Sequence, residues 1–321
     1  LQLPVHGKEV AETLERAIEM ARKLEPSAPA TTVSVAPIVP APAAPARPLG
    51  KVFAVASATG GCGKTFMATN LAYFLHTHGG GRRVCLVDLD LQFGEVSTAL
   101  RLKPRYTIYD ALHREDGDEG DLSEHIEEYL VAHETGINVL AAPKDPSEAD
   151  HISPPDVTRV IEAARQHFDY VIVDTPSALT EIVLAAFEGS ERLFVMATLD
   201  LPSVRNLGVF LTTLEKLKVP TDNVRLILNK AESDVGIEIS QVEKLFPQGF
   251  EAVLPYAKEV SRSINLGMPV MASSPNAEVS RNLVPTMSAL LPEGHSIRVE
   301  PLAAGPGFLA RLFHRPQPRT S

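Results

Sequence analysis

The sequence predicts an α/β fold built on a doubly wound, mostly parallel sheet with helices on both faces. Three observations support this prediction. Short apolar segments alternate with helical patterns, a glycine-rich turn separates the first of these segments from the first helix, and acidic residues end two of the segments. Strands that are apolar throughout are typical of parallel sheets that are buried on both faces.

The expected strands are short, mainly apolar runs bounded by turns or helices. They are residues 51–57, 83–88, 137–141, 170–174, 193–196 and 224–229. Apolar residues at helical spacing predict helices at 66–75, 155–167 and near 203–217. Strands separated by helices in this way favour a parallel sheet over an antiparallel one.

The turn after the first strand fits a phosphate-binding loop. It reads Ala58-Thr59-Gly60-Gly61-Cys62-Gly63-Lys64-Thr65, with Ala58 in place of the usual first glycine. Backbone N–H groups would surround the phosphates, Lys64 would reach the β- and γ-phosphates, and the Thr65 hydroxyl would ligate Mg²⁺. A chance match is the alternative, but a strand before the loop and a helix after it are the context that directs a helix N-terminus at phosphate. The sequence therefore predicts a P-loop NTPase domain.

Acidic residues stand where ligands bind in such sheets, at the carboxyl ends of strands. Val171-Ile172-Val173-Asp174 is an apolar strand ending in an acid that would hold Mg²⁺ through Thr65 or a water. Asp88 and Asp90 close the second strand and, as alternate residues, face the same side. One of them would support Mg²⁺ while the other orients the attacking water. The alternative is that such acids are only helix caps or turn residues.

Composition limits the classes of function. The formal charge of −10 argues against sequence-independent nucleic-acid binding, so a nucleic-acid partner is not expected. Cys62 and Cys85 are the only two cysteines, which suits a reduced cytoplasmic chain. No apolar run reaches transmembrane length, and there is no secretory signal.

Four segments are expected along the chain. Residues 1–25 combine a strand end with one amphipathic helix, which cannot bury its apolar face alone, so we expect the C-terminal remnant of a larger domain. They resemble the end of a receiver domain, although Leu3 stands where such domains carry Lys; a free amphipathic helix is the alternative. Residues 26–50 form a Pro/Ala-rich linker, 51–292 the main domain and 293–321 a flexible tail.

The tail contains a short amphipathic segment, 307–315. On a helix Phe308, Leu309, Leu312 and Phe313 would share one face, away from the arginines. This pattern predicts peripheral contact with a membrane surface. A segment this short binds weakly unless two copies act together. The alternative is a tail that packs on its own domain or stays unstructured.

The order of these motifs resembles that of the MinD/ParA ATPases over residues 51–292. The resemblance rests on the loop 58–65, on Val87-Asp88-Leu89-Asp90, on 169–176, on Leu228-Asn229-Lys230 and on 254–271. Within that family, Asp88-Leu89-Asp90-Leu91-Gln92-Phe93-Gly94 is most similar to the CpaE/TadZ branch of pilus-assembly ATPases. That branch commonly carries an N-terminal receiver-like domain, in agreement with residues 1–25.

The resemblance implies ATP and Mg²⁺ as ligands and assigns roles to individual residues. Lys64 and Asp90 would be catalytic, with Asp90 positioning the water, and Thr65, Asp88 and Asp174 would hold the metal. The nucleotide would contact Gly60, Gly61, Cys62, Gly63, Lys64, Thr65, Phe66, Asn229, Lys230 and Pro255, the last three near adenine. Members of the family typically close ATP between two subunits, which implies an ATP-dependent homodimer.

One position departs from the family pattern. Thr59 stands where the family carries a second lysine that reaches the partner's nucleotide. Threonine is short and neutral, and neutralising phosphate charge in the transition state has a large effect on rate. We therefore expect ATP binding with slow hydrolysis. The alternative is that threonine is tolerated without consequence.

The leading hypothesis is a cytoplasmic ATPase that acts as a polar scaffold for pilus or secretion machinery. The alternatives are a chromosome- or division-positioning ATPase and an ATP-binding scaffold that does not hydrolyse. Tyrosine kinases of this fold carry a tyrosine-rich tail, whereas Tyr256 is the last tyrosine here. The nitrogenase iron protein needs cluster-ligating cysteines, for which the positions of Cys62 and Cys85 are unsuited.

Overall fold

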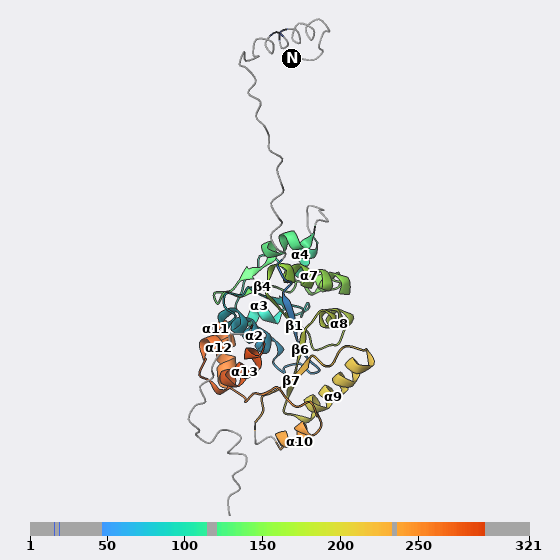
Figure 1. Cartoon of the computed structure of the whole chain (residues 1–321), viewed down its shortest axis with the longest axis vertical. Coiled ribbons are helices and arrows are strands. Elements are labelled where there is room, and N and C mark those ends of the chain that lie inside the picture. The colour runs from blue at the N-terminus through green and yellow to red at the C-terminus, as the bar shows by residue number, and fades with distance from the viewer. Residues whose placement is uncertain (1–15, 17–18, 20–46, 114–120, 233–235, 293–321) are drawn as a thin grey trace, which may run out of the picture. The chain divides into compact units, whose positions relative to one another are not determined.

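The computed structural model describes residues 47–113, 121–232 and 236–292, together with Arg16 and Glu19 (Figure 1). The chain divides into two units, residues 1–46 and 47–321, and the second unit contains nearly all of the described residues. Apart from Arg16 and Glu19, the expected remnant 1–25 lies outside the described residues. So do most of the linker 26–50 and the tail 293–321 with its segment 307–315.

One eight-stranded sheet forms the centre of the second unit, in the order β3-β4-β2-β5-β1-β6-β7-β8. Neighbouring strands pair in parallel except β3, which is antiparallel to β4. The strands are β1 Lys51–Ser57, β2 Val84–Asp88, β3 Val131–Ala132, β4 Asn138–Leu140, β5 Tyr170–Asp174, β6 Arg192–Thr198, β7 Val224–Asn229 and β8 Ala252–Val253. The predicted doubly wound, mostly parallel fold is confirmed.

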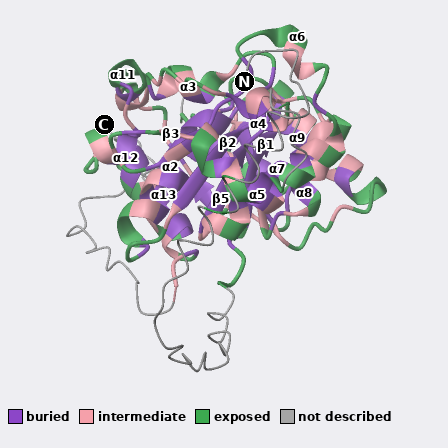
Figure 2. Ribbon diagram, turned by 90° about the horizontal axis from the view of Figure 1, so that it is seen from above, coloured by how far each residue is buried: buried purple, intermediate pink, exposed green. Residues whose placement is uncertain are grey.

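Helices cover both faces of the sheet (Figure 1), so that its strands are almost entirely buried (Figure 2). One apolar core lies under α2 Lys64–His78, α3 Glu95–Ala99, α12 Val270–Ser273 and α13 Glu278–Ser288. The other lies under α4 Ile108–Leu112, α5 Leu122–His125, α7 Pro154–His167, α8 Glu181–Glu188, α9 Leu201–Lys216 and α10 Ile239–Glu243. The remaining helices described within residues 47–292 are η1 Ile126–Tyr129, α6 Pro146–Ala149 and α11 Lys258–Leu266.

The six predicted strands all occur, with ends shifted by two residues at most. The predicted helices correspond to α2, α7 and α9. The edge strands β3 and β8 were not expected, because each has two residues and is defined by its pairing partner rather than by a local pattern. The fold brings the carboxyl ends of β1, β2, β5, β6 and β7 to one edge of the sheet, where the predicted site residues lie.

Candidate functional site

The loop between β1 and α2 has the backbone that phosphate binding requires. Gly63 immediately precedes α2 with φ 97° and ψ 33°, a left-handed conformation that glycine adopts without strain. A Cβ atom at Gly63 would lie 2.5 Å from Nδ2 of Asn229, so a side chain there would also collide with β7. Lys64 and Thr65 form the first turn of α2, and its N-terminus therefore faces the loop.

Two consecutive carbonyl groups of the loop are held from β7. Nδ2 of Asn229 donates to the Cys62 carbonyl at 2.8 Å, and Nζ of Lys230 donates to the Gly61 carbonyl at 2.8 Å. A peptide unit is planar with its C=O and N–H on opposite sides. Fixing these carbonyls on the β7 side thus orients the N–H groups of Cys62 and Gly63 away from β7.

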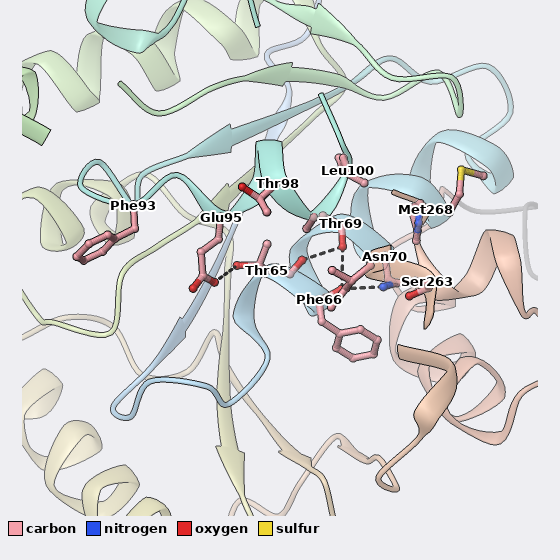
Figure 3. Close-up of a pocket in the computed structure, with 13 residues that line it drawn as sticks. Thr65, Phe66, Thr69, Asn70, Phe93, Glu95, Thr98, Leu100, Ser263 and Met268 are labelled. Carbon is pink, nitrogen blue, oxygen red and sulfur yellow. Dashed lines mark hydrogen bonds between the residues drawn. The ribbon is translucent and has the colours of Figure 1, made fainter. Parts of the chain in front are cut away.

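The Thr65 hydroxyl lies between two carboxylates. It is 2.6 Å from Oδ2 of Asp174, at the end of β5. It is also 3.1 Å from Oε2 of Glu95, at the start of α3 (Figure 3). The hydroxyl has one proton, so it donates a hydrogen bond to only one of these carboxylates at a time. Oδ1 of Asp174 is buried and has no hydrogen-bond partner among the described residues. Burial raises the pKa of Asp174 to about 7, although the bond from Thr65 and the charge of Lys64 oppose this shift.

Asp88 is fully buried beside Asp174, its partner in the register of β2 and β5. Its two oxygens accept the backbone N–H groups of Asp90 and Val96, each at 3.0 Å. Asp88 thus shapes the turn that carries Asp90 and leads into α3. Burial, together with the charge of Asp174, raises the pKa of Asp88 well above its ordinary range. Burial and the charge of Glu95 also raise the pKa of Asp90.

Ser177, Asn206 and Glu95 contact the loop, and the sequence did not single out any of them. Nζ of Lys64 donates to the Ser177 hydroxyl at 2.9 Å. Nδ2 of Asn206 on α9 donates to the Thr59 hydroxyl at 3.3 Å. Glu95 contacts Thr65, as described above. Glu95 and Ser177 each follow a strand-end acid, Asp88 and Asp174 respectively. That closeness in sequence could have identified both residues. Asn206 has no comparable signal, because tertiary packing alone brings α9 to the loop.

A cleft of about 400 Å³ opens beside the loop. Predicted residues on its wall are Gly61, Gly63, Lys64, Thr65, Phe66, Asn229, Lys230 and Pro255. Asp88 and Asp174 are buried and do not line the cleft, whereas Val260 and Ile264 of α11 do. A second cavity of about 260 Å³ shares Thr65, Phe66, Glu95 and Ile264 with the cleft (Figure 3). The structure thus brings the loop, the β7 end and Pro255 together around one space.

The residues present fit Mg²⁺ with a nucleotide phosphate. Asp174 offers an unpartnered buried oxygen next to the Thr65 hydroxyl, and a cation there would remove the cost of ionising it. Across the described ranges, no group of three or more His, Cys, Asp or Glu side chains could hold a metal by itself. Mg²⁺ does not need one, since it is usually bound by one or two protein ligands, waters and phosphate oxygens.

Comparison with known proteins agrees with this geometry. A family model described as an AAA domain matches residues 50–227, more than half of the chain. The septum site-determining protein MinD of Thermotoga maritima is 25% identical over an alignment covering 82% of this chain and 96% of that protein. The sporulation initiation inhibitor Soj of Bacillus subtilis is 26% identical, covering 75% and 99%. MinD of Pyrococcus horikoshii, solved in complex with Mg-ADP, has the same fold, with TM-score 0.64, 20% identity and coverage of 75% and 96%.

Proposed function

Because this chain belongs to the MinD/ParA family of P-loop ATPases, we propose that it binds and hydrolyses Mg·ATP and uses this cycle to position a cellular structure. The observation that carries the proposal is the Thr65 hydroxyl, 2.6 Å from the buried Asp174 carboxylate at the N-terminus of α2. Lys64, one residue earlier, lies in the same cleft. A hydroxyl, a carboxylate and an ammonium so placed are the groups that hold a metal-bound triphosphate.

Each residue of this site would take a separate part in binding and hydrolysis. Thr65 and Asp174 would hold the metal, which when bound neutralises charge on the β- and γ-phosphates. Lys64 would leave Ser177 and pair with the phosphates, a change that costs little because it exchanges one acceptor for another. Asp90 would orient the attacking water. Asp88 would support the metal indirectly by shaping the turn that holds Asp90.

ATP is further proposed to bring two copies together. Size-exclusion chromatography with light scattering should give a monomer mass without nucleotide or with ADP, and twice that mass with Mg·ATP. Lys64→Ala, which removes the cation for the phosphates, should remain monomeric under ATP. Calorimetry would first show that the protein binds ATP. If its mass is then the same in all nucleotide states, nucleotide-driven dimerisation is contradicted, while the proposal of ATP binding stands.

The threonine at position 59 is proposed to keep hydrolysis slow. Its hydroxyl is engaged by Asn206, a neutral partner, so position 59 supplies no charge. Thr59→Lys should raise the steady-state rate by about tenfold or more, because a cation at developing phosphate charge lowers the barrier. Thr59→Ser, which keeps the hydroxyl, is the control and should leave the rate unchanged. Equal rates in all three proteins would show that position 59 does not limit turnover.

Within the family we propose the CpaE/TadZ type, a scaffold for pilus or secretion machinery at a cell pole. Support comes from the segment Asp88–Gly94 and from the receiver-like pattern in residues 1–25. The similarity to MinD and Soj favours a second candidate, a division- or chromosome-positioning ATPase. ATP-dependent retardation of DNA on a gel would favour chromosome positioning over the pilus scaffold. ATP-driven dimerisation without hydrolysis would identify a scaffold that does not hydrolyse.

Membrane contact through 307–315 is the proposed route to peripheral localisation of a cytoplasmic protein. Among the described helices, none combines the length and apolarity needed to cross a bilayer. Co-sedimentation with anionic liposomes should be stronger with Mg·ATP than with ADP, because two joined copies bind more tightly than one. Removing residues 307–316 should abolish it, and equal sedimentation of both proteins would exclude this role.

A further inference from the structure

Asn229, the last residue of β7, and Lys230, which follows it, contact the phosphate loop in a way that adenine recognition does not explain. Asn229 is 6% exposed, and its side chain is directed at the Cys62 carbonyl. Lys230 is exposed, yet its ammonium is directed at the Gly61 carbonyl rather than at a carboxylate. Two successive residues at the end of β7 thus bind two successive carbonyl groups of the loop. This pairing requires the two segments to run side by side with matching positions.

The backbone at Lys230 is strained in a way that makes this contact possible. Its φ of 51° lies in the left-handed region, where a residue with a side chain carries a cost of order 1 kcal/mol or more. Oδ1 of Asn229 accepts the Lys230 backbone N–H at 2.9 Å and so holds this conformation. The same asparagine side chain therefore binds the loop through its nitrogen and fixes Lys230 through its oxygen.

We propose that Asn229 and Lys230 form a clip that holds the phosphate loop in its anion-binding conformation before nucleotide arrives. In this role they are positioning residues, because they act on the loop through its carbonyl groups. The inference rests on the proposed function, because it concerns how the same site receives ATP. Its physical basis is the peptide geometry: two carbonyls held on the β7 side leave the N–H groups of Cys62 and Gly63 for the phosphates.

The clip also explains why a side chain at position 63 would collide with Asn229. A Cβ atom there would meet Nδ2 of Asn229, the atom that donates to the Cys62 carbonyl. The loop and the strand end are packed against each other without space for a methyl group. An anion site that is already organised avoids the cost of arranging its donors during binding.

The first test measures nucleotide binding by calorimetry for Lys230→Ala, Lys230→Arg and the control Lys258→Ala. Lys258 is an exposed lysine at the start of α11, whose later residues line the cleft. Lys230→Ala should weaken ATP and ADP binding alike by about 5- to 20-fold, since a charge-assisted hydrogen bond is lost. Its preference for ATP over GTP should remain that of the wild type. Lys230→Arg should restore most of the affinity, and Lys258→Ala should have none of these effects.

The second test follows the loop itself in the nucleotide-free protein. Hydrogen exchange of the backbone amides of residues 60–64 should be faster in Lys230→Ala than in the wild type, whereas Lys258→Ala should match the wild type. Lys230→Gly removes the ammonium but relieves the left-handed strain. It should therefore lose affinity as Lys230→Ala does while its melting temperature is equal to or above that of the wild type.

The outcomes separate this inference from the function on which it rests. A wild-type protein that binds no ATP overturns the proposed function. A wild-type protein that binds ATP, with unchanged affinity and loop exchange in Lys230→Ala, overturns the clip alone. A Lys230→Ala protein that loses its preference for ATP over GTP, with unchanged loop exchange, assigns Lys230 to the base and also overturns the clip.

Discussion

Gly63→Ala should abolish measurable ATP binding and destabilise the fold, a large effect for one added methyl group. The new side chain would sit at φ 97°, and its Cβ atom would lie 2.5 Å from Nδ2 of Asn229. Asn229 cannot withdraw without losing its bond to the Cys62 carbonyl. Backbone strain of about 1–3 kcal/mol and a lost buried hydrogen bond of similar size together predict about 2–6 kcal/mol of destabilisation. ATP affinity should fall about 100-fold or more.

Gly81→Ala is the matched control for the conformational part of this effect. Gly81 has a φ of 82°, but no atom lies within 4 Å of the position of its Cβ. It should lose about 1 kcal/mol of stability and bind ATP as the wild type does. Urea unfolding and calorimetric titration with Mg·ATP measure both quantities. Equal losses of affinity in the two variants would show that the contact with Asn229 is irrelevant to the nucleotide site.

Asp174→Asn should stabilise the nucleotide-free protein at pH 8 and remove its response to Mg·ATP. Burial raises the pKa of Asp174 from 3.8 to about 7. When the pKa of an acid is raised in the folded state, ionising that acid costs more free energy in the folded protein than in the unfolded one. The folded state is therefore penalised at a pH where the acid must ionise. This penalty is absent below about pH 4, grows as the pH rises to about 7, and is complete above it. Asparagine carries no such penalty and can still accept the Thr65 hydroxyl. The variant should be about 2–4 kcal/mol more stable than the wild type at pH 8.

The pH dependence makes this prediction specific. At about pH 5.5, where the wild-type carboxyl is largely protonated in the folded state, the difference in the free energy of unfolding should shrink. Asp121→Asn is a control of opposite sign, because hydrogen bonds from Ser123 lower the pKa of Asp121 and its carboxylate caps α5. Urea unfolding at the two pH values, with and without Mg·ATP, gives the comparison. An Asp174→Asn protein that is less stable than the wild type at pH 8 would contradict the burial argument.

The sequence predicted the fold and the phosphate loop because both depend on local patterns. β1, the turn and α2 are contiguous, so the residues from Lys51 to His78 carry the whole signal. Asp174 and Asp88 were found for the same reason, as each ends an apolar strand. Their surroundings were not predictable, because the partners of a carboxylate are decided by packing. Asp88 uses both oxygens on the backbone of its own turn, which spacing alone does not reveal.

The contacts that the sequence missed come from elements distant along the chain. Asn206 reaches Thr59 from α9, and their separation of 147 residues leaves no local trace. Glu95 meets Thr65 only because the Asp88 turn directs the start of α3 toward α2. Asn229 and Lys230 were identified through a family resemblance and expected near adenine. Their hydrogen bonds to the loop depend on the sheet order, in which β7 pairs with β6 and β6 pairs with β1.

The shortness of the two edge strands, β3 and β8, affects how molecules of this protein can associate in a crowded cell. β3 and β8 have two residues each, so the outermost strand at each edge of the sheet offers only a short run of backbone to another molecule. Long, flat edge strands can pair with strands of other molecules and cause aggregation, whereas short edge strands suppress such pairing. The proposed ATP-driven association of two copies needs such protection, because molecules joined through their sheets would stay together whether or not ATP was bound. The short edge strands therefore leave the proposed association to other surfaces, which a bound nucleotide can control.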